Sequence, residues 1–496
     1  MSTIAPFKNI VFGEHSAEIE KVESPSLVET AYFDESGYLG ALLGSSKFLI
    51  LGTKGSGKST LIQKIISTQA YDKQITFNDL NQFPFSNFQS AGFSGSIGKE
   101  QTLPKSWTWI LVIQLLWSLY EDQGRSPNSD YDKFMQGLRQ IGFAPATKFD
   151  DIVQQTRDSK SILHGPSIEF DALFGVNATV NTFKYDRNTN QNKDINFSKL
   201  VDYAMTILLQ QKSENKHYIL IDGLDRALFS EKNSYDSISA LVSECSHLNQ
   251  QFREGSNPFK IIIACRTDLF DKLPLYNSNA IRNTYSLVLD WHDDHRDIYK
   301  SRLIKLANYR AAATLQSEVN IFNIYFKKII EVQGRERLTA AYILYHTRNT
   351  PRDLIMALKF IQESSTGDNI PITTSEIITG LTKYSENYFV HEVEDELKGH
   401  ISETDIEKTI QSLRFFGRNR FQSKKFTDQM ESLGITEEHA THILKLLFDA
   451  SAIGNLIVKA DGQLRPVSRH YSSSARLVLS SDIIVHRGLW KAFDYV

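Results

Sequence analysis

The stretch FLILGTKGSGKSTLIQKI, residues 48–65, limits the possible folds more than any other part of the chain. Its first four residues are apolar, as in a strand that is buried on both faces of a parallel sheet. A loop with three glycines and two lysines follows, and the apolar residues after Ser59 recur at the spacing of one helix face. Strand, glycine loop and helix in this order predict an α/β domain built on a parallel sheet.

Residues 52–59 match the pattern G-x-x-x-x-G-K-[ST] in full. Glycines let backbone N–H groups surround phosphates, and the following helix adds the partial positive charge of its N-terminus. Lys58 can reach the β- and γ-phosphates, and the Ser59 hydroxyl can ligate Mg²⁺. We therefore expect a P-loop that binds ATP and Mg²⁺ through Gly52, Thr53, Lys54, Gly55, Ser56, Gly57, Lys58, Ser59 and Thr60.

A P-loop needs a carboxylate on a neighbouring strand to hold the Mg²⁺ shell. The stretch YILIDGLD supplies a buried strand that ends at Asp222, which we expect to be a metal ligand together with Ser59. Many ATPases have a Glu directly after this Asp, but here the position is Gly223. The next carboxylate, Asp225, either orients the attacking water or caps the following helix. The missing Glu favours slow hydrolysis, which suits a switch.

Two arginines are further candidates for contact with the nucleotide. Arg266 follows the buried run IIIAC, where it either senses the γ-phosphate or pairs with an acid such as Asp268. Pro351 is expected in the first turn of a helix. Arg352, beside it, either reaches the phosphates from a helical domain or is a solvated residue at the helix start.

Composition adds few constraints. The net charge of the 496 residues is -3, which gives no general argument for a nucleic-acid or membrane partner. Two cysteines, Cys245 and Cys265, imply no disulfide framework or zinc site, and we expect a cytoplasmic protein. The N-terminus lacks the pattern of a signal peptide. The apolar run WTWILVIQLLWSLY is shorter than the about 20 residues of a membrane-spanning helix, so we predict a buried core helix.

The pattern of segments predicts three domains. Residues 1–291 form the core with an insertion at about 70–200, in which residues 167–197 look like a β-hairpin or an exposed loop. Residues 292–400 read as a helical lid domain, including a helix over EVNIFNIYFKKIIEV, residues 318–332. In residues 401–496, three helices precede strand-like pieces, which predicts a winged helix-turn-helix module.

The stretch RFFGRNRFQSKKF mixes cations with aromatic residues, a combination that can hold phosphates and stack bases of nucleic acid. Three acids, Glu431, Glu437 and Glu438, lie close by in the sequence, which favours a solvated surface instead. The cations concerned are Arg414, Arg418, Arg420, Lys424 and Lys425.

In this order, the stretches GTKGSGKST, LIDGLD, IIIACR and NTPRDL resemble the signal-transduction ATPases with numerous domains (STAND), a branch of the AAA+-like P-loop NTPases that includes the NACHT and KAP groups. LVLDW, residues 287–291, is similar to the short strand that joins core and lid in this group. More closely, the chain resembles stand-alone bacterial ATPases with a D-G-L-D motif that occur beside antiviral defence genes. The resemblance covers residues 47–65 and 215–365, and the C-terminus loosely.

By position, the resemblance implies that Lys58 and Ser59 contact phosphate and Mg²⁺, Asp222 ligates Mg²⁺, Asp225 acts in hydrolysis, Arg266 is a sensor 1 residue and Arg352 contacts the nucleotide from the lid. Arg226 departs from the pattern of NACHT-type proteins, which often have an acid there. The resemblance implies an ATP-dependent, slowly hydrolysing switch that forms a homo-oligomer and signals to a separate effector protein in anti-phage defence. The alternatives are a nucleic-acid-binding ATPase that acts through the winged helix, and a scaffold that binds nucleotide without turnover.

Overall fold

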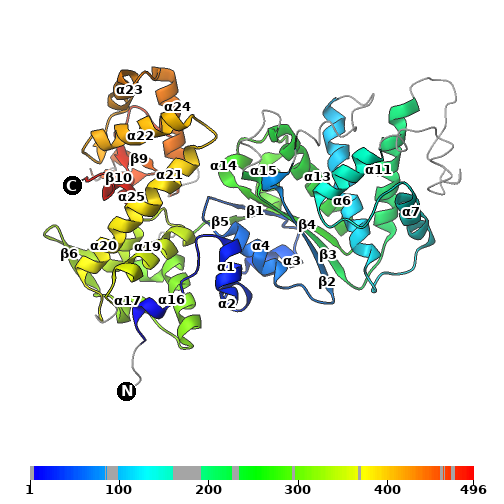
Figure 1. Cartoon of the computed structure of the whole chain (residues 1–496), viewed down its shortest axis with the longest axis horizontal. Helices are drawn as coiled ribbons and strands as arrows, with labels where there is room; N and C mark the ends of the chain where they lie inside the picture. The colour runs from blue at the N-terminus through cyan, green and yellow to red at the C-terminus, as the bar shows by residue number, and fades with distance from the viewer. Residues whose placement is uncertain are drawn as a thin grey trace. The chain divides into compact units, whose positions relative to one another are not determined.

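The computed structural model of the chain describes residues 5–83, 85, 99–159, 192–225, 234–292, 297–366, 370–458, 462, 464–470 and 475–495. The chain divides into two compact units, whose elements are labelled in Figure 1. The sheet unit comprises Ser36–Gly52 and Lys64–Val288, and the C-terminal unit comprises Met1–Glu35, Thr53–Gln63 and Leu289–Val496. The domain boundaries at 291 and 400 stay predictions.

The sheet unit is built on five strands in the order β2-β3-β4-β1-β5. These strands are β1 (Leu49–Gly52), β2 (Lys73–Asp79), β3 (Lys216–Asp222), β4 (Phe259–Arg266) and β5 (Ser286–Leu289). The β2–β3, β3–β4 and β4–β1 pairs are parallel, so the carboxyl ends of these four strands share one edge of the sheet. Ligands of open α/β sheets bind at that edge. The prediction of an α/β fold with a parallel sheet is confirmed.

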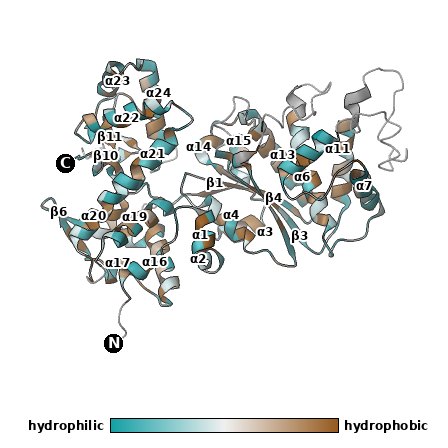
Figure 2. Cartoon of the chain, in the orientation of Figure 1, coloured by the Kyte–Doolittle hydropathy of each residue, from teal (hydrophilic) through white to brown (hydrophobic). Residues whose placement is uncertain are grey.

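Long helices cover this sheet, and the hydropathy of strands and helices can be followed in Figure 2. They are α6 (Lys99–Tyr120), α11 (Asn192–Gln210) and α13 (Ser234–Glu254), of which α6 contacts both others and β3. The middle strands carry apolar residues such as Ile219 and Ile261, which are buried in the core that these helices share. Coverage by helices explains why β1, β3 and β4 have continuous apolar runs.

Helix α6 contains the apolar run that was compared with a membrane span. Trp107 and Trp109 are fully buried, and their indole N–H groups donate to the Ser237 carbonyl and the Thr156 hydroxyl, each at 2.9 Å. The prediction of a buried core helix is therefore confirmed. Within the described residues, no helix is both long and apolar enough to cross a membrane.

Strand β2 lies in the segment that the sequence analysis treated as part of an insertion. It pairs with β3 along its whole length, from Lys73 opposite Lys216 to Asp79 opposite Asp222. After α6 come α7 (Ser129–Gln140) and α8 (Phe149–Asp158), whose buried side chains belong to the same core. The hairpin predicted over residues 167–197 falls largely outside the described residues.

The C-terminal unit begins with short helices that pack on its own later helices. Phe7 and Phe12 belong to its core, and the Arg310 guanidinium forms a buried ion pair with Glu20 at 2.7 Å. The helices involved are η1 (Phe7–Asn9), α1 (Ala17–Glu23), α2 (Pro25–Glu29), α16 (Arg302–Leu315), α18 (Thr339–Leu344), α19 (Pro351–Ser364), α20 (Thr374–Tyr384), η5 (Ser385–Phe389) and α21 (Val390–Leu397).

The helix predicted over residues 318–332 is wrong. A short helix, α17 (Ile321–Ile324), is followed by an antiparallel hairpin of β6 (Ile329–Val332) and β7 (Arg335–Leu338). Gln333 and Gly334 form the connection with φ of +53° and +70°, the left-handed pair that favours a two-residue hairpin turn. The β-branched residues before this turn also favour a strand.

Three helices and a small sheet form the last part of the C-terminal unit. The helices are α22 (Glu403–Phe415), α23 (Ser423–Ser432) and α24 (Glu437–Asp449). The strands β8 (Arg420–Phe421), β9 (Ile453–Val458), β10 (Leu464–Val467) and β11 (Ile483–Val485) pair in the order β10-β9-β11-β8. Within the described residues, the remaining short helices are α3 (Tyr38–Gly44), α4 (Lys58–Ile66), η2 (Leu80–Gln82), α14 (Thr267–Phe270), α15 (Ser278–Ala280), η3 (Ile281–Tyr285), η4 (Ile298–Lys300) and α25 (Arg487–Trp490).

Candidate functional site

The glycine loop starts where β1 ends, at Gly52, and α4 begins at Lys58. Gly55 and Gly57 have φ of +78° and +95°, in the left-handed region that side chains disfavour. No heavy atom lies within 4 Å of a Cβ added to Gly57, so its backbone borders open space. Lys58 is 8% exposed, and its Nζ donates to the Thr53 carbonyl at 3.1 Å, which brings the ammonium group against the loop.

This loop fits an anion such as a phosphate. The first N–H groups of a helix have no acceptor within the helix, and α4 presents them directly after Gly57. The buried Ser56 hydroxyl has no hydrogen-bond partner among the described residues. Ser59 and Thr60, in the first turn of α4, are half-buried. Glycine backbone, lysine and helix N-terminus are thus assembled within nine residues of sequence.

Distant segments of the C-terminal unit hold this loop in place. The Trp291 indole N–H donates to the Ser56 carbonyl at 2.8 Å, and the Arg352 backbone N–H donates to the Gly55 carbonyl at 3.3 Å. A Cβ added to Gly55 would lie 3.1 Å from Arg352 Cβ. Gly55 therefore gives the loop both its positive φ and the close approach of α19.

The carboxylate of Glu392 lies close to three cationic side chains beside the loop. Oε2 of Glu392, on α21, lies 3.2 Å from Lys54 Nζ, 3.4 Å from Arg348 Nη2 and 3.9 Å from Arg352 Nη1. Arg348 is also paired with Asp353 at 2.9 Å and lies 4.0 Å from Glu396. The charge of Glu392 is therefore shared mainly by Lys54 and Arg352. Lys54 and Arg352 were predicted from the sequence to contact the nucleotide, but Glu392 was not. No local sequence pattern links Glu392 to Lys54, which lies far away in the chain.

The start of α19 is fixed by a buried ion pair between Arg348 and Asp353. Asp353 accepts hydrogen bonds from Arg348 Nε at 2.9 Å, Arg348 Nη2 at 3.0 Å and the Tyr388 hydroxyl at 3.1 Å. Burial alone would raise the pKa of Asp353, but the Arg348 guanidinium outweighs it and holds this pKa well below its usual value. Pro351 occupies the first turn of α19, as predicted, and Thr350 caps it.

In the sheet unit, two carboxylates end neighbouring strands. Asp222 is the last residue of β3, and Asp79, the last residue of β2, lies opposite it in the parallel register. The Asp222 Oδ1 accepts from the Gly223 N–H at 2.8 Å, and Asp79 Oδ1 accepts from the Asn81 N–H at 3.0 Å. The sequence analysis missed Asp79, since β2 lacks the continuous apolar run by which the other strands were recognised.

The geometry around Gly223 explains why no acid follows Asp222. Gly223 has φ of +80°, and a Cβ added to it would lie 2.1 Å from Asp79 Oδ1. A glutamate at this position would therefore collide with Asp79 as well as strain the backbone. Asp225 follows two residues later and is half-buried. Arg226 lies outside the described residues.

Arg266 ends β4, opposite Gly52 at the end of β1. Its guanidinium forms a bidentate pair with Asp268, with Nε 3.0 Å from Oδ1 and Nη2 2.8 Å from Oδ2. The pairing considered as an alternative in the sequence analysis is thus present. A role of Arg266 toward a γ-phosphate stays a prediction.

Oxygen donors for a metal ion such as Mg²⁺ lie at the ends of two strands and at the start of α4. Among the described residues, no three His, Cys, Asp or Glu side chains gather closely enough to hold a metal ion. Mg²⁺ is usually bound through one or two carboxylates together with waters and substrate phosphates. In the sheet unit, the neighbouring carboxylates of Asp222 and Asp79 are donors of this chemistry. In the loop, the Ser59 hydroxyl is a donor of the same kind.

Comparisons with known proteins add little to this geometry. No family model and no curated protein matches the chain. A Walker-type ATPase of Pyrococcus abyssi is similar in structure with a TM-score of 0.35 and 11% sequence identity, over 89% of this chain and 95% of that chain. The P-loop and the parallel sheet, described above from the chain's own residues, therefore carry the functional argument.

Proposed function

We propose that this chain binds ATP with Mg²⁺ through residues 52–60, hydrolyses it slowly and acts as a nucleotide-dependent switch. The observation that carries the proposal is the loop itself. Gly57 borders open space, the helix N-terminus follows it, and the Lys58 ammonium lies against the loop. Backbone N–H groups, a helix dipole and a lysine are the groups with which P-loops bind a triphosphate.

In this proposal, Lys58 contacts the β- and γ-phosphates, and Ser59 and Asp222 hold Mg²⁺. When bound, Mg²⁺ would neutralise charge on the phosphates. Asp225 orients the attacking water, and slow hydrolysis follows from the glycine at position 223. The roles of Arg266 and Arg352 toward the γ-phosphate are part of the same proposal.

Replacing Asp225 by Asn tests the assignment of the water-orienting residue. We expect Asp225→Asn to bind ATP with unchanged affinity and to hydrolyse it about 100-fold more slowly, in the range of a lost general base. ATP affinity is measured by isothermal titration calorimetry, and hydrolysis by phosphate release. Unchanged hydrolysis would show that Asp225 does not orient the water and would favour its alternative role as a helix cap.

The contacts of the loop support a switch. Lys54 and Arg352 lie within 4 Å of the Glu392 carboxylate, and both are cations that a phosphate attracts. ATP therefore competes with Glu392 for these cations, and its binding and release shift the equilibrium between two arrangements of residues 292–400. Such a shift is what the proposed lid domain would transmit.

Assembly into a homo-oligomer, signalling to a separate effector protein and anti-phage defence are implied by the resemblance to STAND-type ATPases. Assembly is tested by the mass of the protein in solution with and without ATP. An increase in mass with ATP·Mg²⁺ supports the assembling switch. A monomer under both conditions contradicts it.

The order of elements in residues 403–485 supports a winged-helix module, since a strand follows the first helix and a β-hairpin follows the third.

The alternative function, binding of nucleic acid through this module, receives less support. Phe416, Phe421 and Phe426 are at most 6% exposed and belong to the core, so they do not offer faces for base stacking. Of the phenylalanines in the stretch RFFGRNRFQSKKF, Phe415 alone is exposed, at 69%. Arg420 is paired with Asp482, and α24 exposes Glu437 and Glu438 at its start. Acids at this place repel phosphates.

A further inference from the structure

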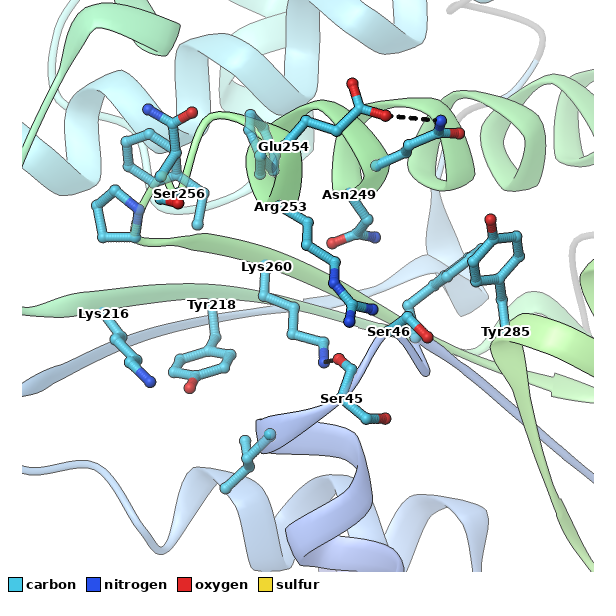
Figure 3. A pocket seen from close by; sticks show the side chains of 18 of the residues that line it. Ser45, Ser46, Lys216, Tyr218, Asn249, Arg253, Glu254, Ser256, Lys260 and Tyr285 are labelled. Carbon is cyan, nitrogen blue, oxygen red and sulfur yellow. Dashed lines mark hydrogen bonds between the residues drawn. The ribbon is translucent and has the colours of Figure 1, made fainter.

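A hollow of about 810 Å³ lies in the sheet unit at the amino ends of the strands (Figure 3). Its lining includes Ser46 and Phe48 just before β1, Lys216 at the start of β3, and Lys260 near the start of β4. The last turns of α13 form another wall. This volume is within the range of small-molecule pockets, about 300–1,000 Å³.

Three cations line this pocket. Lys216 and Arg253 are exposed, whereas Lys260 is half-buried and its Nζ donates to the carbonyls of Leu42 and of Ser45, the latter at 2.6 Å. In Figure 3, the Arg253 guanidinium points into the space between Lys260 and Ser46. Burial, followed by the charges of Arg253 and Lys216, lowers the pKa of Lys260 to about 8. The cations therefore repel one another.

Little negative charge balances them. Glu254 is the one acid among the described residues of the lining, and its Oε1 accepts a hydrogen bond from Gln250 at 2.9 Å. In the described part of the chain, no carboxylate forms an ion pair with Lys216, Arg253 or Lys260. An anion in the pocket would reduce the repulsion among the three cations.

We propose that this pocket binds a small polyanion that carries two or more phosphate groups. A guanidinium offers parallel N–H donors that match phosphate oxygens, and two lysines add charge. The hydroxyl groups of Ser46 and Tyr285, which also line the pocket, are further donors. This site is separate from the P-loop: β1, β3 and β4 begin at the pocket and end at Gly52, Asp222 and Arg266. The proposal does not depend on ATP binding by the loop.

Calorimetric titration of the full chain with inorganic tripolyphosphate tests this proposal. The titration uses the Lys58→Ala variant as background, so that binding at the P-loop is weakened and the pocket is measured. In this background we expect saturable binding, which Arg253→Ala and Lys216→Ala each weaken at least tenfold. The matched control is Lys133→Ala, which removes an exposed positive charge of α7 outside the pocket. This variant should change the affinity less than twofold.

Two results would overturn the proposal. One is the absence of tripolyphosphate binding in the Lys58→Ala background. The other is an affinity of both Arg253→Ala and Lys216→Ala that equals that of Lys133→Ala. Both pocket residues tested are exposed, so these variants are expected to fold, which thermal melting of each variant verifies. Binding that weakens as the salt concentration rises would further support an electrostatic site.

Discussion

Asp353 is the residue whose replacement should reveal most about how the chain supports its P-loop. Its side chain is fully buried and accepts hydrogen bonds from the Arg348 N–H, from Arg348 Nε and Nη2, and from the Tyr388 hydroxyl, at 2.9–3.1 Å. The Asp353→Asn variant removes the charge of the bidentate partner of the buried Arg348 guanidinium, which keeps only the longer contacts to Glu392 at 3.4 Å and Glu396 at 4.0 Å. Breaking a buried ion pair in this way typically costs about 3–5 kcal/mol of folding free energy.

This free energy converts into a large change in melting temperature. For a unit of this size, 1 kcal/mol corresponds to roughly 2–4 °C, so Asp353→Asn should lower the Tm of the C-terminal unit by about 6–20 °C. Differential scanning calorimetry at neutral pH measures this change. The matched control is Tyr388→Phe, which removes one hydrogen bond and should cost only about 1 kcal/mol.

The same substitution should also affect the loop, because the Arg348–Asp353 pair fixes the turn from which the Arg352 N–H reaches Gly55. A strong ion pair is excluded if Asp353→Asn melts within about 2 °C of the wild type, which corresponds to a loss of at most about 1 kcal/mol. It is also excluded if Tyr388→Phe is as destabilising as Asp353→Asn, since the charge pair would then contribute nothing beyond an ordinary hydrogen bond.

Two further predictions concern a glycine and a buried acid. Gly223→Ala should destabilise the sheet unit by about 2–4 kcal/mol, because its φ is positive and a Cβ there would lie 2.8 Å from the backbone nitrogen of Asn81. Gly40→Ala, in α3 with no atom within 4 Å of the added Cβ, should be neutral or stabilising in the same melting experiment. Equal effects of the two variants would contradict the geometry. Burial raises the pKa of Glu376, but hydrogen bonds from Thr366 and from the N-cap of α20 outweigh it and lower the pKa to about 2. Glu376 therefore stabilises the fold above its unfolded pKa of about 4.3, and this contribution is lost as the pH falls toward 2. The difference in Tm between wild type and Glu376→Gln should shrink from pH 6 to pH 3, and a constant difference would show that the carboxylate charge is not involved.

Much of the sheet could be predicted from the sequence because its middle strands are buried on both faces. The runs that end at Leu51, Ile221 and Cys265 are apolar without interruption, which is the pattern of a covered parallel strand. Strand β2, KQITFND, lies at the edge of the sheet, where most of its residues are half-buried and polar residues are tolerated. Its sequence therefore has no clear pattern, and Asp79 was missed with it.

The contacts of the candidate site could be predicted only in part. The P-loop is recognisable because its residues are adjacent in the sequence and each has a local conformational reason. Glu392 and Trp291 reach the loop from far along the chain, and such pairings are decided by tertiary packing. The hairpin β6–β7 was read as a helix because a short apolar segment fits both periodicities, and the left-handed pair Gln333–Gly334 decides between them.

According to the proposed function, the loop at residues 52–60 binds a nucleoside triphosphate. Titration of the full chain with ATP·Mg²⁺, followed by calorimetry and by melting temperature, tests it most directly. We predict saturable binding that stabilises the wild type by about 2.7 kcal/mol at 100 times the Kd and that Lys58→Ala weakens. A wild-type protein that neither releases heat nor gains stability with ATP·Mg²⁺, or a Lys58→Ala variant that binds as tightly as the wild type, would contradict it.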